Sequence, residues 1–224
     1  MKLRLAAVVA LAVPAVLAAP PAGFTPIFDG KDLAGWHVSQ TNHHGNSRGW
    51  SVKDGVLLAT QDRPGNGGIL LTDRKYRDFE VSLEVDPDWG CDGGLFLRSN
   101  EAGDAYQVMI DYLEGGSVGG IYGEGLKGVE KNATELVNRD WATHWKKGEW
   151  NLLRARIEGD VPHIRVWLNE TPLVDWTDTA NHAKDGATEG MIALQMHLSN
   201  EKTPRWKAGG YHRFRNIAIR ELPR

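Results

Sequence analysis

The sequence predicts an all-β protein organised as a two-sheet antiparallel sandwich. Short segments rich in Val, Ile, Leu, Phe and Tyr are separated by turns that contain Gly, Pro and Asp. Several segments alternate apolar and polar residues, which is the period of a strand with one face in a core. No long helical periodicity follows the N-terminal segment. Many short strands without helices are typical of sandwiches.

Residues 1–18 have the pattern of a secretory signal peptide. A basic start precedes an apolar run over residues 5–17, and Ala18 ends a small-residue cleavage site. The run is short for a membrane span, and Pro14 interrupts it. We therefore expect export to the periplasm or the medium, with no integral membrane span; an uncleaved anchor is the alternative. Residues 19–224 then suit a single large β domain.

Composition narrows the class of protein further. The chain has 224 residues, a formal net charge of −3 and one cysteine, Cys91. The absence of a basic stripe argues against a nucleic-acid partner. One cysteine cannot form an intramolecular disulfide, and a domain of this size has enough core without one. No Cys/His pattern surrounds Cys91, so we expect a packed residue rather than a nucleophile.

The expected elements follow one another closely along the chain. Residues 24–36 contain an Asp-Gly turn between aromatic residues, and residues 40–49 form a polar loop. Strands are expected at 50–53 and 56–59 around a second Asp-Gly turn, and then at 69–72, 79–85, 95–98, 106–111, 150–158, 163–168, 172–176, 191–197 and 211–222. Residues 129–148 are irregular, and Trp141 and Trp145 within them suit either sugar stacking or loop packing.

Adjacent histidines lie in the first polar loop. A strand would point His43 and His44 to opposite faces, which weakens their interpretation as metal ligands. We therefore interpret the loop as solvated and predict no metal and no cofactor. The fold could still gather His197, Glu124 and Asp111 as ligands, because nothing in their spacing excludes it.

The runs 95–98 and 106–111 predict a hairpin with one apolar and one polar face. In the first run the two leucines share a face, so Arg98 lies on the opposite one. In the second run the tyrosine, valine and isoleucine share a face, and Gln107 and Asp111 share the other. The hairpin is therefore expected to gather an arginine, an amide and a carboxylate that can act on a polar substrate.

Two further segments supply polar side chains. In the run 191–197, Gln195 and His197 alternate with isoleucine, leucine and methionine. In a glycine-rich segment, Tyr122 and Glu124 share a face if the backbone is extended. That segment contains a G-x-G-x-x-G pattern, but no helix follows it, so we discard a dinucleotide site. If these polar faces lie beside the hairpin, they form one pocket.

Short motifs spread over the chain resemble the family of 3-keto-disaccharide hydrolases. They are FDGKDL at 28–33, GW at 35–36, GLFLR at 94–98, YQVMID at 106–111, GIY at 120–122, VWLN at 166–169, IALQMH at 192–197 and FRNI at 214–217. Each motif is short, but the combination is specific and spans nearly all of residues 19–224. The resemblance implies a concanavalin-like jelly roll, export, and hydrolysis of carbohydrates oxidised at the sugar 3-position.

A ketone at C3 defines the chemistry that such a site must perform. It makes the hydrogen on C2 acidic, so a base can remove it, the C1 substituent can leave, and water can add back. We assign the base role to His197 or Asp111, and support of the enolate oxygen to Arg98. The other predicted site residues bind the substrate: Gln107 and Gln195 orient it, and Tyr122 and Glu124 are candidates for the acid.

Other functions remain open on the residues alone. A retaining glycosidase needs two close carboxylates, and at the corresponding strand positions the sequence has Met109, Asp111 and Glu114, so one is missing. A non-catalytic, lectin-like sugar-binding module or an interaction protein shares the same architecture. Arg98 and Asp111 could also form a structural ion pair, and His197 could be a structural histidine. The oligomeric state stays open.

Overall fold

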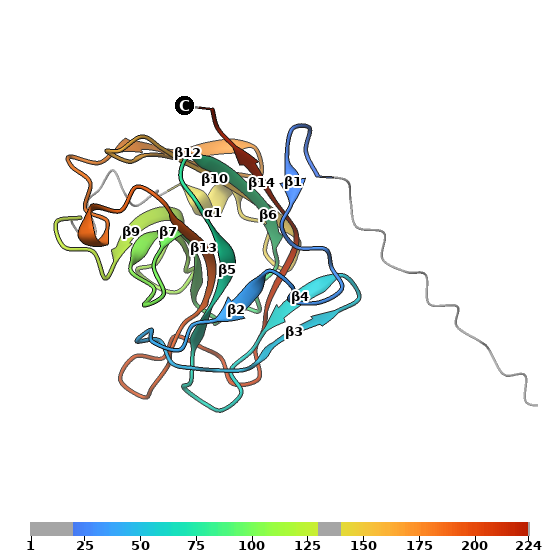
Figure 1. Cartoon of the computed structure of the whole chain (residues 1–224). Helices are drawn as coiled ribbons and strands as arrows, with labels where there is room; N and C mark the ends of the chain where they lie inside the picture. Colours follow the sequence, from blue (N-terminus) through green and yellow to red (C-terminus); the bar gives the residue numbers. More distant parts are fainter. Residues whose placement is uncertain (1–19, 130–139, 224) are drawn as a thin grey trace, which may run out of the picture.

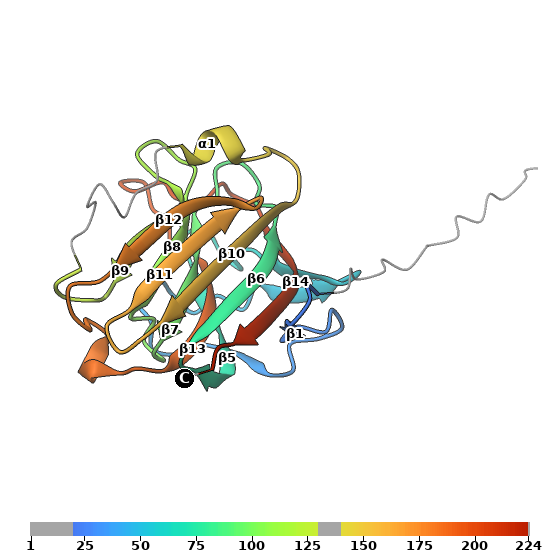
Figure 2. The same ribbon diagram turned by 90° about the horizontal axis from the view of Figure 1, so that it is seen from above.

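The computed structural model describes residues 20–129 and 140–223. Two antiparallel sheets pack face to face, as Figures 1 and 2 show from two directions, which confirms the predicted all-β sandwich. The signal peptide predicted at residues 1–18 lies outside the described residues and stays a prediction. None of the helices described is long and apolar enough to cross a membrane.

The larger sheet has the order β12-β11-β10-β6-β14-β4-β3, and β1 pairs with β14. Its strands are β1 (Thr25–Pro26), β3 (Trp50–Lys53), β4 (Val56–Ala59), β6 (Phe79–Val85), β10 (Asn151–Glu158), β11 (His163–Leu168), β12 (Thr171–Thr177) and β14 (His212–Glu221). Strong alternation along β6, β10 and β11 places every second side chain in the core. No strand was expected at β1, and the bounds expected for the other strands of this sheet differ by one residue at most.

The smaller sheet has the order β2-β5-β13-β7-β8-β9. Its strands are β2 (Trp36–Val38), β5 (Gly68–Tyr76), β7 (Gly93–Ser99), β8 (Ala105–Ile110), β9 (Val118–Glu124) and β13 (Gly190–Met196). Two short helical turns, α1 (Trp141–His144) and η2 (Lys184–Gly186), join strands. The glycine-rich segment is extended, as β9.

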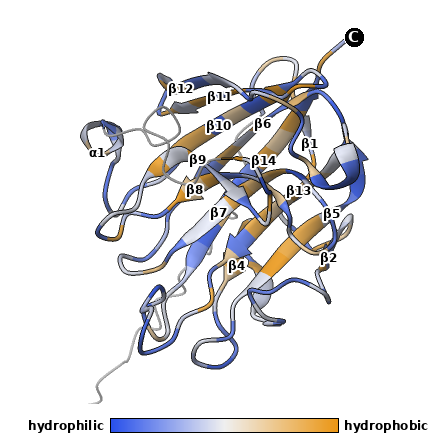
Figure 3. Cartoon of the chain, turned by 90° about the vertical axis from the view of Figure 1, so that its left-hand side faces the viewer, coloured by the Kyte–Doolittle hydropathy of each residue, from blue (hydrophilic) through white to orange (hydrophobic). Residues whose placement is uncertain are grey.

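The core fills the space between the two sheets. Figure 3 shows apolar stretches along the strands of both layers. The alternation predicted for the central hairpin is confirmed there, since Leu95, Leu97 and Val108 are fully buried among residues of the opposite sheet. Trp145 packs beside a buried cluster and stacks on Tyr112, with ring centroids 6.1 Å apart, which favours the packing interpretation of that loop.

The outer face of the smaller sheet is divided into an apolar and a polar part. A second buried cluster covers its middle and consists of Ile69, Leu71, Phe96, Ala105, Met191 and Ala193. The loop over residues 39–49 lies against this face, because the ring of His44 is 6.4 Å from that of Phe96 and the backbone N–H of Ser39 donates to the carbonyl of Ile69. The polar part begins where β7, β8 and β13 meet the adjoining loops.

Candidate active site

Three neighbouring strands bring chain-distant residues to one polar cavity. Gly93 at the start of β7 pairs with Ile110 at the end of β8 and with Met196 at the end of β13. The residues just beyond these ends are therefore neighbours. The cavity, of about 240 Å³, is lined by Asp92, Gln107, Met109, Asp111, Gly115, Tyr122, Glu124, His197, Thr203 and Arg205. Five of the seven predicted site residues are among them.

Two buried carboxyl groups share this cavity with one arginine. Nη1 of Arg205 donates to Oδ2 of Asp111 at 3.0 Å, and the backbone N–H of Leu113 donates to Oδ1. Burial raises the pKa of Asp111 even though these two donors oppose it. Burial, and then the charge of Asp111, raises the pKa of Asp92 to about 8. At neutral pH Asp92 therefore holds a proton that it can donate.

His197 lines the same cavity and has one unprotonated ring nitrogen. Its Nδ1 lies 2.5 Å from the carbonyl oxygen of Leu198, and because a carbonyl only accepts, Nδ1 carries the proton. Nε2 is then a lone-pair acceptor, and it lies 3.8 Å from Oδ2 of Asp92. Burial lowers the pKa of His197, with nearby His44 and Arg205 acting in the same direction, so the ring is neutral at pH 7. A neutral imidazole can serve as a general base.

A row of amides lies behind the cavity. Nε2 of Gln107 donates to Oε1 of Gln195 at 3.0 Å, and Nε2 of Gln195 lies 3.1 Å from Nε2 of His44. Gln195 is fully buried, so it supports His44, and the expectation that it contacts substrate directly is wrong. Gly94 makes room for the row, because a Cβ there would stand 2.4 Å from Nε2 of Gln107.

The loop histidines reach the cavity edge, and their interpretation as solvated is wrong for His44. His44 is 3% exposed and sits on a turn, where successive side chains can point the same way, as they cannot on a strand. Nε2 of His43 lies 2.8 Å from Oε1 of Glu124, and Nε2 of His44 lies 3.7 Å from the same oxygen. Tyr122 and Glu124 both line the cavity, as their shared face predicted.

Arg98 does not join the other predicted site residues. The register of β13 against β7 shifts between Met191 and Ala193, and Arg98 takes a positive φ of 53° at this bulge. The bulge turns its side chain away from the face of Gln107. Its guanidinium donates instead to Oδ1 of Asp78 at 2.8 Å and to the carbonyl of Gly159 at 3.0 Å. The expectation that Arg98 shares a polar face with Gln107 and Asp111 is wrong, and so is the alternative Arg98–Asp111 ion pair; Gln107 and Asp111 do line one cavity.

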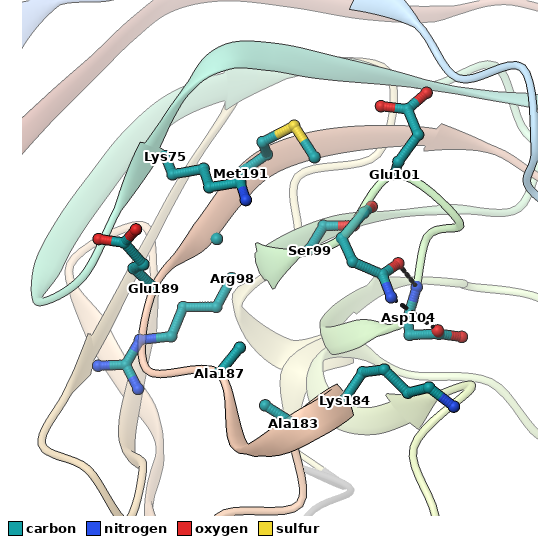
Figure 4. A pocket seen from close by; sticks show the side chains of 12 residues that line it. Lys75, Arg98, Ser99, Glu101, Asp104, Ala183, Lys184, Ala187, Glu189 and Met191 are labelled. Atoms are coloured by element: carbon teal, nitrogen blue, oxygen red, sulfur yellow. Dashed lines mark hydrogen bonds between the residues drawn. The ribbon is translucent and has the colours of Figure 1, made fainter.

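A larger cavity, of about 340 Å³, lies at the opposite ends of β7 and β13 (Figure 4). Its lining includes Lys75, Arg98, Glu101 and Glu189. Arg98 is the only predicted site residue there, and its guanidinium is held by Asp78. No histidine is among the described residues that line this cavity, whereas the smaller cavity joins a neutral imidazole to a protonated carboxyl. We therefore treat the smaller cavity as the candidate active site.

Sequence reasoning missed Asp92 and Arg205. Both lie in irregular segments, where no alternation marks which way a side chain points. The clue for Asp92 was its position three residues before the strand expected at 95–98, because the start of that strand lies beside the end of its hairpin partner. Cys91 beside it is buried, as expected, and burial raises the pKa of its thiol to about 11, which leaves it unreactive at neutral pH.

Comparison with known proteins gives a match to one family over most of the chain and a match to one curated protein over part of it. The model of the 3-keto-alpha-glucoside-1,2-lyase-like domain matches residues 23–220. A curated protein of Bacteroides thetaiotaomicron, named 3-keto-disaccharide hydrolase, is 28% identical over 100 residues. That match covers 41% of this chain and 33% of the relative, so most of the relative's length has no counterpart in the alignment.

Solved structures share the fold at low identity. A candidate glycosyl hydrolase from Parabacteroides distasonis has a TM-score of 0.58 and 21% identity, over 90% of this chain and 94% of that one. The alginate lyase Aly36B has a TM-score of 0.51 and 15% identity, over 78% of this chain and 84% of that one. At these identities the two likenesses show the sandwich fold and nothing finer.

Proposed function

Because the chain belongs to the 3-keto-alpha-glucoside-1,2-lyase-like family, as its motifs predicted, we propose that it hydrolyses glycosides whose sugar carries a ketone at C3. The observation that carries the proposal is the pairing of His197 with Asp92. The imidazole of His197 is neutral, and its Nε2 carries no proton. This nitrogen lies 3.8 Å from Oδ2 of Asp92, whose pKa is raised to about 8. A base and an acid are thus available together at neutral pH.

The cleavage half-reaction uses both groups. Nε2 of His197 removes the proton from C2, and the electron pair forms an enolate with the C3 carbonyl. The carbonyl then reforms, a C1–C2 double bond appears, and the C1–oxygen bond breaks. Asp92 donates its proton to the departing oxygen, so the leaving group is neutral. Asp111 is held by Arg205, which suits it for orienting a hydroxyl better than for acting as the base.

The hydration half-reaction restores the active site. Water adds its hydroxyl to C1 of the unsaturated ketone and gives its proton to the Asp92 carboxylate. The imidazolium of His197 returns a proton to C2. The sum is hydrolysis of the glycosidic bond, with base and acid back in their starting states. Gln107, Tyr122 and Glu124 line the cavity in which the sugar would lie.

A retaining glycosidase mechanism has less support. It requires an ionised carboxylate nucleophile and a second carboxyl about 5–5.5 Å away. Asp111 is paired with Arg205, and Glu114, the other carboxylate considered from the sequence, is exposed and does not line the cavity. A lectin-like module remains the non-catalytic alternative, which the experiment below separates. We also propose that the protein is exported, on the pattern of residues 1–18.

The test offers the purified protein 3-keto-trehalose or another 3-keto-glucoside in D₂O, with the unoxidised sugar as control. We expect cleavage of the oxidised substrate only, and a 3-keto monosaccharide that carries deuterium at C2. Cleavage that leaves no deuterium at C2 and that is no slower for a substrate deuterated at C2 would contradict the elimination route. Binding of either sugar without cleavage would replace the proposal with the lectin alternative.

A further inference from the structure

The elimination route needs a positively charged group beside the C3 oxygen of the substrate. The cavity has few side chains that can supply one. Negative charge develops on this oxygen when C2 loses its proton. Arg98, which the sequence assigned to this role, points to Asp78 instead. Among the described residues that line the cavity, Arg205 is the only arginine or lysine, and Asp111 binds it at 3.0 Å. Another source of positive charge would complete the site.

Two imidazoles and a carboxylate converge at the edge of the same cavity. His43, His44 and Glu124 each offer a ligand atom, and all of these atoms lie within 4.8 Å of one another. Oε1 of Glu124 lies 2.8 Å from Nε2 of His43 and 3.7 Å from Nε2 of His44. Ligand atoms bound tetrahedrally to Zn²⁺ at about 2.1 Å stand about 3.4 Å apart, a value between these two distances.

The loop that carries the histidines is fixed on the sheet. Oδ1 of Asn42 accepts from the backbone N–H of His44 at 2.9 Å, and Oγ of Ser39 accepts from the backbone N–H of Asn42. The amide of the buried Gln195 lies against the ring of His44, with its Nε2 3.2 Å from Nδ1 and 3.1 Å from Nε2. This contact holds the ring in place, although through an N–H donor rather than through the acceptor that usually orients a metal-bound histidine. Glu124 comes from the end of β9, so the ligands combine a braced loop with a strand.

We propose that His43, His44 and Glu124 bind one divalent transition-metal ion at the edge of the cavity that His197 lines. Two histidines and one carboxylate form a ligand set that suits Zn²⁺ or Fe²⁺ and leaves coordination positions open to a substrate. His44 and His197 have ring centroids 5.3 Å apart, so the ion would be a close neighbour of the base. This departs from the expectation that the protein takes no metal.

The role of the ion rests on the proposed function, whereas its binding does not. A divalent ion beside the sugar would polarise the C3 carbonyl and stabilise the enolate oxygen, which is the role that Arg98 leaves open. His43 is the ligand best able to adjust, since its side chain is 54% exposed, while that of Glu124 is 13% exposed.

Metal binding is tested without substrate. The protein is dialysed against a chelator and titrated with Co²⁺, by calorimetry and by the visible spectrum of the bound ion, and Zn²⁺ is then added as a competitor. We expect one ion per chain, and at least about a hundredfold weaker binding in Glu124→Gln and in His43→Ala. The matched control is His163→Ala, which removes a histidine that also contacts carboxylates, Asp175 and Glu158, on the larger sheet.

The outcomes separate the two proposals. No bound ion, or binding that is unchanged in Glu124→Gln and His43→Ala, would overturn the metal site whatever the activity. Loss of 3-keto-glucoside cleavage on chelation, restored by Zn²⁺ or Co²⁺, would support both the site and its role. An ion bound at these residues, with full cleavage by the metal-free protein, would overturn the role in stabilising the enolate. Thermal unfolding of each variant without metal checks that it folds.

Discussion

The outer face of the larger sheet and the cavity of the smaller sheet both concentrate ionisable side chains, but they balance charge differently. On the larger sheet, the buried carboxylate of Glu80 has two arginine partners, with Nε of Arg154 at 3.2 Å and Nη2 of Arg220 at 2.7 Å. In the cavity, Asp92 and Asp111 have one arginine between them. On the larger sheet, arginines balance the charge of the carboxylate. In the cavity there are too few arginines, so a bound proton neutralises one of the two carboxyl groups.

The pKa values follow this balance. Glu158 on the larger sheet is partly buried, which opposes ionisation, but hydrogen bonds from Arg156 and Arg165 outweigh burial and lower its pKa. For Asp92, burial and the neighbouring carboxylate prevail and raise the pKa to about 8. The same type of side chain is thus a fixed charge on one sheet and a proton donor on the other. The number of cationic side chains near a carboxyl group decides whether it is ionised or holds a proton at neutral pH.

The largest effect that we expect, and the first test of this contrast, is a loss of catalytic rate. We expect His197→Ala to lower kcat/KM for a 3-keto-glucoside by about 10²–10⁴-fold, because the C2 proton loses its base. The midpoint of thermal unfolding should change little, since the side chain is 23% exposed and makes one hydrogen bond to its neighbour's carbonyl. Turnover within threefold of the unchanged protein would contradict the assignment.

Breaking the buried ion pair of Arg98 should give the next largest effect, on stability. The Arg98 side chain is 1% exposed, and Arg98→Met leaves Asp78 without its main partner. We expect the free energy of unfolding to fall by about 3–5 kcal/mol, measured by urea denaturation. The double variant with Asp78→Asn should recover part of this loss. No recovery would show that the pair is not the cause.

The pH dependence of the rate sharpens the comparison further. Asp92 is protonated below its pKa of about 8, so kcat/KM should fall about tenfold per pH unit above that value as the acid is lost. Asp92→Asn should lower the rate and remove this limb of the profile. Asp86→Asn is the control, since Asp86 is an acidic residue outside the cavity. A profile that keeps the limb in Asp92→Asn would assign the acid elsewhere.

The same group makes a prediction for stability. Its pKa is about 8 in the folded protein against an ordinary value of 3.8, so the folded state holds a proton that the unfolded chain releases between these values. The contribution of Asp92 to the free energy of unfolding should therefore fall as pH rises from 4 to 8, by up to about 1.4 kcal/mol per unit. Urea unfolding at several pH values should show a flatter dependence in Asp92→Asn. An unchanged slope would contradict the raised pKa.

The smallest expected effect lies on the larger sheet. Arg220 is 41% exposed, and in Arg220→Met the carboxylate of Glu80 keeps its contact with Arg154. We expect the free energy of unfolding to fall by about 1 kcal/mol or less, and kcat/KM to stay unchanged. A loss of several kcal/mol would show that this face is less evenly balanced than the distances indicate.

The sequence by itself determined most of the strands, their inward faces and most of the residues on the polar side. Alternation is a local property of extended backbone, so Leu95, Val108 and the polar positions of Gln107 and Asp111 could be assigned without knowing any partner strand. His197 followed from the same period. The family motifs, which are also local, pointed to the function class.

Only the tertiary structure decided how these residues combine. A bulge set by pairing with β13 turned Arg98 away, and a loop laid across the sheet brought His44 to the cavity edge. Asp92 and Asp111 share Arg205 because the fold brings together segments that are far apart in the chain. Register shifts, loop placement and pKa values depend on long-range packing and burial, which no local pattern in the sequence records.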